Sequence, residues 1–435
     1  MNTATPTTNG VALFDQPGGW RHGLRYGLLG LPLAFAALPL YVVWPNHYAR
    51  EHGVSLAALG AVLLGARLFD AVIDPLIGRW CDAAFRRSVA GVLWLGALAC
   101  AVLALGFAGL FFPPMALGTS AALLAWAVAG LLLTYTAYSV VSVGHQSWGA
   151  MLGGTEAQRA RVVAWREALG LVGVVLAAIL PSLAGLGITA TVFALLLVLG
   201  CWAWTGAVRP VPDMASRGEP MASAWAPLRQ PAFARLLGVF MVNGIASAVP
   251  ATLVLFFVQD RLQASAAMEP AFLGTYFLCA AASMPVWLRV VARLGLARAW
   301  RAGMGLSVLV FAWAAFLGAG DVWAFLAVCA LSGLALGADL AVPGALLAGV
   351  VGDMGERGRG EGRYFGWWNF ATKLNLALAA GLALPLLGWW GYAPGQRDPQ
   401  ALDALTWAYC ILPCALKLLA TAGLQHFIIN KDIRS

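Results

Sequence analysis

Residues 89–112 read V-A-G-V-L-W-L-G-A-L-A-C-A-V-L-A-L-G-F-A-G-L-F-F, and this run contains no charged side chain. An α-helix needs about 20 apolar residues to cross the hydrocarbon core of a bilayer. Similar runs recur along nearly the whole chain, and short polar segments separate them. The sequence therefore predicts an all-α polytopic membrane protein.

We expect twelve membrane-spanning helices, arranged as two bundles of six. The expected spans are 24–44, 54–78, 89–112, 119–145, 166–186, 188–208, 235–257, 270–290, 302–320, 322–348, 365–388 and 404–426. The longest link, 209–234, contains five prolines and lies between the sixth and seventh spans. The expected organisation is an N-terminal bundle at 1–208, a cytoplasmic linker at 209–234 and a C-terminal bundle at 235–435.

The composition excludes several functional classes. Of 435 residues, 61% are hydrophobic and 11% are charged, whereas a soluble domain carries about 25% charged residues. The net charge of +8 is spread one loop at a time, which argues against nucleic acid as a partner. No G-x-x-x-x-G-K-[ST] motif for nucleotide binding occurs. A membrane enzyme is disfavoured because no polar link exceeds about 26 residues. We expect a transporter rather than an enzyme.

The orientation follows from the positively charged loops, which stay in the cytoplasm. On the expected topology, 21 Lys and Arg residues fall on one side and three on the other: Arg50, Arg261 and Arg397. The last three basic residues, Arg67, Lys373 and Lys417, lie inside spans. We therefore expect both termini to be cytoplasmic in a bacterial-type inner (plasma) membrane, with lipid around a monomer.

Charged residues inside the spans are the main functional signal. The second span and its exit read A-R-L-F-D-A-V-I-D-P-L-I-G-R-W-C-D, from Ala66 to Asp82. Asp70 and Asp74 are four residues apart, so they project from one helical face. Asp339 lies in the span 322–348. A charge at the bilayer centre costs about 2.5–3.5 kcal/mol, so each of these groups must be paired, hydrated or occupied by a ligand.

Two interpretations account for these charges. In the first, Arg67 with Asp70 and Asp339 with Lys373 are buried ion pairs. In the second, Asp70 and Asp74 bind a cation, because two carboxylates one turn apart repel each other unless a cation or proton joins them. Ser139 and Ser142 would supply further oxygens. We expect no cofactor beyond a transported Na⁺ or H⁺, between which the sequence does not decide. Lys417 is expected to extend toward the cytoplasm without a functional role.

The stretch R-L-F-D-A-V-I-D-P-L-I-G, from Arg67 to Gly78, resembles the glycoside–pentoside–hexuronide:cation symporters. These form the melibiose-permease-like branch of the major facilitator superfamily. Their helix-4-to-5 and helix-11 regions are similar to H-Q-S-W-G-A-M, from His145, and to E-G-R-Y-F-G-W-W-N-F-A-T-K, from Glu361. The resemblance implies the superfamily fold, cation binding by Asp70 and Asp74, and alternating access.

One departure from that family concerns the substrate. Its sugar-transporting members carry an aspartate in helix 1 and another in helix 4, and neither 24–44 nor 119–145 contains Asp or Glu. A cation-coupled symporter of a small organic solute, such as a sugar or glycoside, is the first expectation. A transporter of a lysolipid-like, amphiphilic or anionic solute is the alternative.

The remaining candidate residues are assigned by position and side-chain type. For His145 and the tryptophans, a structural or interfacial role is the alternative to substrate contact. The candidate substrate-binding residues are Tyr41, Tyr138, His145, Trp148, Asn243, Trp368, Asn369 and Lys373. The candidate coupling or gating residues are Arg67, Asp82, Arg166 and Asp339.

Overall fold

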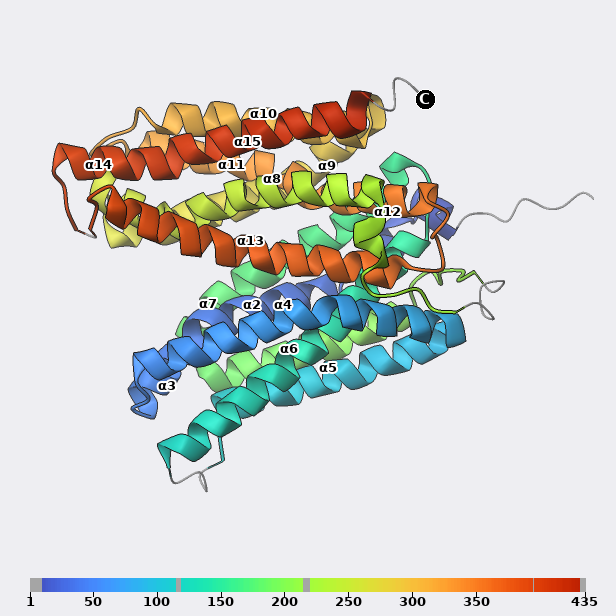
Figure 1. Cartoon of the computed structure of the whole chain (residues 1–435). Coiled ribbons are helices and arrows are strands. Elements are labelled where there is room, and N and C mark those ends of the chain that lie inside the picture. The colour runs from blue at the N-terminus through green and yellow to red at the C-terminus, as the bar shows by residue number, and fades with distance from the viewer. Residues whose placement is uncertain (1–9, 115–118, 214–219, 394, 431–435) are drawn as a thin grey trace, which may run out of the picture. The chain divides into compact units, whose positions relative to one another are not determined.

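The computed structural model describes residues 10–114, 119–213, 220–393 and 395–430. All regular elements within these residues are helical (Figure 1), which confirms the expected fold class. Nine continuous helical runs in this part of the chain are long and apolar enough to span a membrane. Arg217, Lys431 and Arg434, which entered the orientation argument, lie outside the described residues.

The helices fall into two compact units. The first unit contains Met1–Pro227 and Ala348–Phe370, and the second contains Leu228–Leu347 and Ala371–Ser435. The segment 348–370 thus groups with the N-terminal part of the chain. The expected bundle boundaries at 208 and 235 remain a prediction.

The first unit is built from the N-terminal helices. Its first run, Trp20–Glu51, is continuous through a π-helical turn at Pro39–Val43. The helices are α1 (Trp20–Gly27), α2 (Gly30–Leu38), α3 (Trp44–Glu51), α4 (Leu56–Arg87), α5 (Val89–Phe111), α6 (Ser120–Met151) and α7 (Glu156–Thr205).

Hydroxyl side chains start four of these helices. Ser55, Ser88 and Thr119 each accept a hydrogen bond from a backbone N–H in the first turn of α4, α5 and α6. Thr155 and Gln158 form a reciprocal capping box at the start of α7. Each cap satisfies a donor that the helix itself leaves unpaired.

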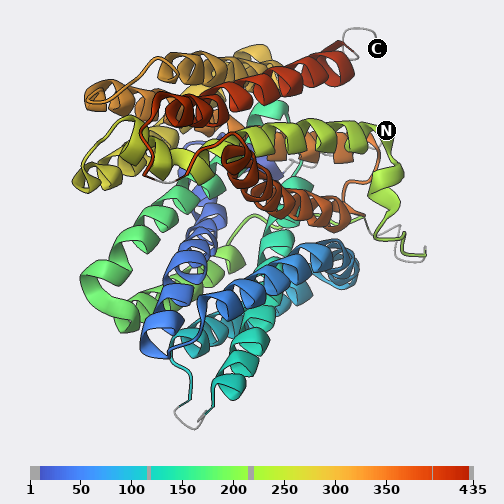
Figure 2. The same cartoon turned by 60° about the vertical axis from the view of Figure 1, so that its left-hand side comes forward.

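Helix α7 contains two of the expected spans, 166–186 and 188–208. It is interrupted at Gly185, whose φ of 78° and ψ of 171° are not helical. Glycine adopts this conformation without the steric cost that a side chain would bring. The chain reverses there, as the green segment in Figure 2 shows. The two spans are therefore antiparallel neighbours, and Gly185 joins them without backbone strain.

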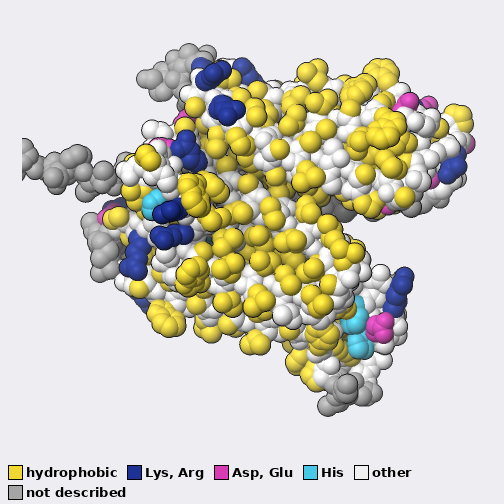
Figure 3. Space-filling view, turned by 180° about the vertical axis from the view of Figure 1, so that it is seen from behind, with side chains coloured by type: hydrophobic (Ala, Val, Ile, Leu, Met, Phe, Trp, Pro, Cys, Tyr) yellow, Lys and Arg dark blue, Asp and Glu magenta, His cyan; other side chains and the backbone are white. Residues whose placement is uncertain are grey.

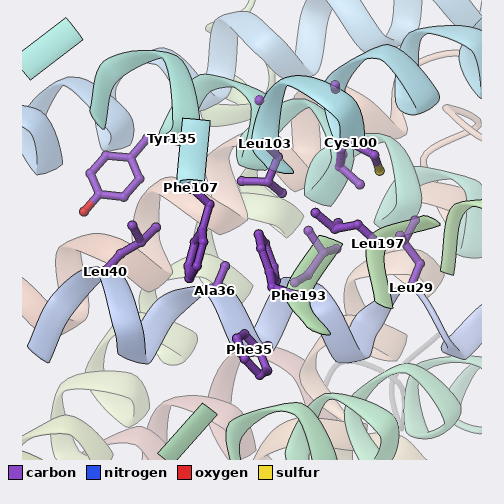
Figure 4. Close-up of a cluster of buried hydrophobic side chains, with 14 of the residues drawn as sticks. Leu29, Phe35, Ala36, Leu40, Cys100, Leu103, Phe107, Tyr135, Phe193 and Leu197 are labelled. Atoms are coloured by element: carbon purple, nitrogen blue, oxygen red, sulfur yellow. The ribbon is translucent and has the colours of Figure 1, made fainter. Parts of the chain in front are cut away.

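Aromatic and aliphatic side chains fill the interior of the first unit (Figure 4). Phe193 of α7 stacks on Phe35 of α2 at 5.5 Å between ring centroids and lies 4.4 Å from Phe107 of α5. Glycines bring the backbones together, because a Cβ at Gly173 would lie 2.1 Å from the carbonyl oxygen of Leu31. Close packing through small residues is one of the sources of helix association in lipid.

The second unit has a separate interior. Phe257 stacks on Tyr409 at 4.3 Å and lies 5.6 Å from Phe325. The helices of this unit are α8 (Pro231–Phe256), α9 (Glu269–Leu294), α10 (Leu296–Ala314), α11 (Val322–Ala341), α14 (Pro399–Thr406) and α15 (Leu412–Leu424). Helices α12 (Pro343–Asp353) and α13 (Glu361–Trp389) each contribute residues to both units.

Several expected boundaries were wrong. The ninth span was expected at 302–320, but α10 covers Leu296–Ala314. It starts directly after Gly295, whose φ of 81° ends α9. Helix α4 continues beyond residue 78 to Arg87, because a helix does not have to end where the apolar run ends. In the space-filling view, hydrophobic side chains cover the helix midsections, whereas Lys and Arg gather at helix ends (Figure 3).

The expected linker is attached to the first turns of α13 and to the loop before it. The backbone N–H of Asp213 donates to the Gly358 carbonyl at 3.1 Å, and its carboxylate accepts from Arg359 at 2.5 Å. Further along, the Ala224 carbonyl accepts from the Trp367 indole at 2.8 Å. These bonds all lie within the first unit.

Candidate functional site

Two buried carboxylates lie one turn apart in α4. The exposed fraction is 6% for Asp70 and 0% for Asp74. The Ser139 hydroxyl of α6 donates to Asp70 Oδ1 at 3.0 Å. Pro75 follows directly and has no N–H, so the Ala71 carbonyl between the acids loses its normal helical donor. Carboxylate and carbonyl oxygens of α4 and a hydroxyl of α6 are thus gathered in one part of the first unit.

Positive and aromatic groups surround this acid pair. The Arg67 guanidinium lies over the Tyr41 ring and interacts electrostatically with Asp70. The Tyr138 hydroxyl of α6 interacts with both acids and with Arg166. The structure thus brings seven expected site residues into one neighbourhood of the first unit: Asp70, Asp74, Ser139, Arg67, Tyr41, Tyr138 and Arg166. The electrostatic interaction of Arg67 with Asp70 agrees with the ion-pair interpretation, and the buried Asp74 is the second carboxylate that a cation site requires.

A polar chain continues from α6 to the start of α13. The Gln146 amide donates to the Ser142 hydroxyl at 2.8 Å and to Asn369 Oδ1 at 3.1 Å. Ser142 and Asn369 were expected as site residues, and Gln146 was missed. Its position one turn after Ser142 was the signal, since residues four apart share a helix face.

Asp82 caps the first turn of α13. Its carboxylate accepts from the Gly362 N–H at 2.7 Å, and from the N–H and side-chain Nε of Arg363 at 3.2 and 3.0 Å. The Asp82 and Arg363 side chains are 1% and 7% exposed. A carboxylate at a helix N-terminus is stabilised by free N–H groups and the helix dipole. A Cβ at Gly78 would lie 2.1 Å from the Gly362 carbonyl oxygen, so this contact requires glycine.

His145 and Trp148 pack inside the first unit. His145 Nε2 lies 2.8 Å from the Tyr26 carbonyl oxygen, and the two rings stack at 4.3 Å. The Trp148 indole donates to the Val208 carbonyl at 2.8 Å and is fully buried. These contacts are those of structural residues. Arg166 forms an ion pair with the adjacent Glu167, and it lies inside α7, which begins at Glu156, rather than at a helix start.

The charges of the second unit correct one expectation. One of the two interpretations paired Asp339 with Lys373, and Lys417 was expected to extend toward the cytoplasm. Instead, Lys417 Nζ lies 2.5 Å from Asp339 Oδ2 and donates to Asn243 Oδ1 at 2.9 Å. A buried carboxylate and an amide oxygen stabilise the ammonium where it lies, which removes the reason for the side chain to extend away.

Three further donors complete this cluster. Asp339 Oδ1 accepts from the Asn243 amide at 3.1 Å and from the Trp300 indole at 2.9 Å. Its Oδ2 also accepts from the Ser247 hydroxyl at 3.2 Å. Trp300 and Ser247 were not predicted as site residues, although Ser247 lies one turn after Asn243. The half-buried Lys373 also belongs to the second unit, and the buried Trp368 belongs to the first.

Comparisons with known proteins agree with this architecture. A family described as MFS/sugar transport protein matches residues 24–431. A bacterial homologue of the iron transporter ferroportin, in an outward-facing state, has a TM-score of 0.70 at 16% identity, covering 94% of this chain and 98% of its own. A comparison with curated protein sequences found no match.

Two other solved structures share the fold. The human organic anion transporter MFSD10 (TETRAN) has a TM-score of 0.63 at 17% identity, covering 97% of this chain and 100% of its own. The transporter FucP, in an outward conformation, has a TM-score of 0.59 at 12% identity, covering 92% and 99%. At these low sequence identities, the likeness shows a common fold and does not identify the substrate of this chain.

Proposed function

The chain belongs to the MFS/sugar transport protein family, and we propose that within it the protein is a cation-coupled symporter of a small organic solute. It is a multi-pass membrane transport protein of the major facilitator superfamily, and not an enzyme. The coupling cation, Na⁺ or H⁺, binds at Asp70 and Asp74 in this proposal. The sequence resemblance to the glycoside–pentoside–hexuronide:cation symporters supports the same assignment.

The acid pair in α4 carries the proposal. Two carboxylates one turn apart cannot both stay ionised in a low-dielectric interior at no cost, because like charges raise each other's energy. One Arg67 charge balances one carboxylate, and a bound cation or proton balances the other. Ser139 and the Ala71 carbonyl offer neutral oxygens, which suit a hard cation such as Na⁺.

Coupling follows from the charge of this site. A cation that enters with the solute moves down the membrane potential, which contributes about 2.3 kcal/mol per charge per 100 mV. This free energy corresponds to a concentration ratio of about 50-fold. Neutralising the acid pair also lowers the cost of moving the site through the low-dielectric part of the transport cycle.

Two classes of solute are candidates for transport. The family description and the resemblance to cation:sugar symporters favour a sugar or glycoside. The absence of acids from the spans 24–44 and 119–145 favours a lysolipid-like, amphiphilic or anionic solute. The structural observation that favours an anionic solute is the charged cluster at Lys417 in the second unit.

Uptake into proteoliposomes tests the proposal. Proteoliposomes of the purified protein are given an inward Na⁺ or proton gradient and radiolabelled melibiose or lysophosphatidylglycerol, an anionic lysolipid. We expect one solute to accumulate above its external concentration under one of the gradients. Asp70→Asn and Asp74→Asn should abolish accumulation. Asp403→Asn, at an exposed aspartate of α14, is the matched control and should accumulate solute normally. Full accumulation by Asp70→Asn would refute the assignment.

A further inference from the structure

The Asp339 carboxylate lies in a cradle of four donors. Each oxygen accepts two hydrogen bonds: Oδ1 from Asn243 and Trp300, and Oδ2 from Ser247 and Lys417. Three of these donors are neutral and one is a cation, which is a donor set that matches a carboxylate. The Asn243 amide also bridges to Lys417 through its oxygen, which fixes the orientation of both side chains.

The cradle and its occupant come from different helices. Asn243 and Ser247 belong to α8, Trp300 to α10 and Lys417 to α15, whereas Asp339 belongs to α11. Asn243, Trp300 and Lys417 are buried, and Ser247 is partly buried. Without Asp339 they would form a buried site of charge +1 that is arranged for an anion.

A proline interrupts the helical hydrogen bonds at Asp339. Helix α11 ends at Ala341, and α12 begins at Pro343. Pro343 has no N–H, so it removes the helical hydrogen bond that the Asp339 carbonyl would otherwise accept four residues earlier. Interrupted helices are where membrane transporters commonly place ligand sites. The carboxylate therefore lies on the last turn before this missing hydrogen bond, and two of its donors, Asn243 and Ser247, lie on a helix that Pro250 interrupts in the same way.

We propose that α8, α10 and α15 form a binding site for the carboxylate of an anionic solute, which Asp339 fills in this structure. The proposal rests on the proposed transport function and names a solute class, a monocarboxylate. A ligand carboxylate replaces that of Asp339, and the four donors keep an acceptor throughout.

Charge balance defines the exchange. Lys417 remains an ammonium and is paired with one carboxylate before and after. The Asp339 carboxylate takes one proton from solvent, which forms an O–H bond, and the neutral side chain then leaves the four donors. No second anion is therefore buried. Tyr276 of α9 also interacts electrostatically with Asp339. One proton therefore accompanies each bound monocarboxylate.

Chemical rescue tests whether the cradle binds carboxylates. Asp339→Ala empties it, and the variant is purified in acetate and then exchanged into chloride. We expect the Tm to fall in chloride and to rise again by about 5 °C at saturating acetate. Acetamide should have no effect. The double variant Asp339→Ala with Lys417→Met should not respond to acetate. An unchanged Tm of Asp339→Ala in acetate, or an equal response of the double variant, would overturn the proposal.

A second, independent test of the proposal uses the native protein. Its Tm is measured with acetate, benzoate and laurate, each compared with its amide. At least one carboxylate should raise the Tm, its amide should not, and the Asp339→Asn, Lys417→Met double variant should lose the response. If Asp339→Ala does not fold, the measurement on the native protein tests the proposal by itself. The proposal is overturned if none of the three acids changes the Tm.

The same titration separates this proposal from that of the α4 cation site. In Asp70→Asn protein the carboxylate response should persist, although cation-driven accumulation is lost. If accumulation instead survives Asp70→Asn while the carboxylate response is present, the cation assignment fails and the cradle stands.

Discussion

Replacing Lys417 by methionine removes the positive charge that neutralises Asp339 in the second unit. The two charged atoms are 2.5 Å apart, and the side chains are 5% and 11% exposed, so solvent screens the pair weakly. Methionine keeps much of the side-chain volume, which limits any packing defect. The expected effect is therefore electrostatic.

The magnitude follows from what remains around the carboxylate. Breaking a buried pair by removing one partner costs about 3–5 kcal/mol. Asp339 keeps its three neutral donors, Asn243, Trp300 and Ser247, so we expect the lower end, about 3 kcal/mol. Adding Asp339→Asn removes the stranded charge, and the double variant should lose only about 1 kcal/mol.

Equilibrium unfolding in mixed micelles of dodecyl maltoside and dodecyl sulfate measures these free energies. Leu418→Met, at an exposed neighbouring position of α15, is the matched control and should change the free energy of unfolding little. The reasoning is refuted if Lys417→Met loses less than about 0.5 kcal/mol. It is also refuted if the double variant is no more stable than the single one.

Three further predictions concern the first unit. Asp82→Asn should speed hydrogen exchange of the Gly362 amide at least about tenfold, because a bond to a charged acceptor is worth about 1.5–3 kcal/mol; an unchanged exchange rate by mass spectrometry would count against the cap. Gly78→Ala should lower the Tm, since its Cβ would lie 2.1 Å from the Gly362 carbonyl oxygen, whereas Gly65→Ala meets open space and should not. Trp148→Phe should lower the free energy of unfolding by about 1 kcal/mol through the lost indole bond, with no change in the KM for solute uptake.

The helices were predictable from the sequence because lipid leaves the backbone no alternative. Every N–H and C=O in an apolar run must be paired within the helix, and the run 89–112 accordingly forms α5, Val89–Phe111. Boundaries were less predictable where a helix continues past the apolar run, as α4 does to Arg87. The start of α10 at Leu296 depended on the conformation of Gly295, which composition does not reveal.

The spacing within one helix predicted part of the site, and the packing between helices decided the rest. Asp70 and Asp74 share a face by their four-residue spacing, and the structure adds Ser139 from α6. The partner of Asp339 could not be predicted in the same way. Lys373 and Lys417 were both available in the sequence, and the choice depends on α15 lying against α8 and α10.

Charge movement on cation binding tests the central claim most directly. Proteoliposomes on a solid-supported membrane are given a rapid jump in Na⁺ concentration or in pH, without solute. The native protein and Asp403→Asn should give a transient current for one of the two cations, and the double variant of Asp70 and Asp74 to asparagine should give none. An equal current from that double variant, with native folding shown by its Tm, would contradict cation binding at these two carboxylates.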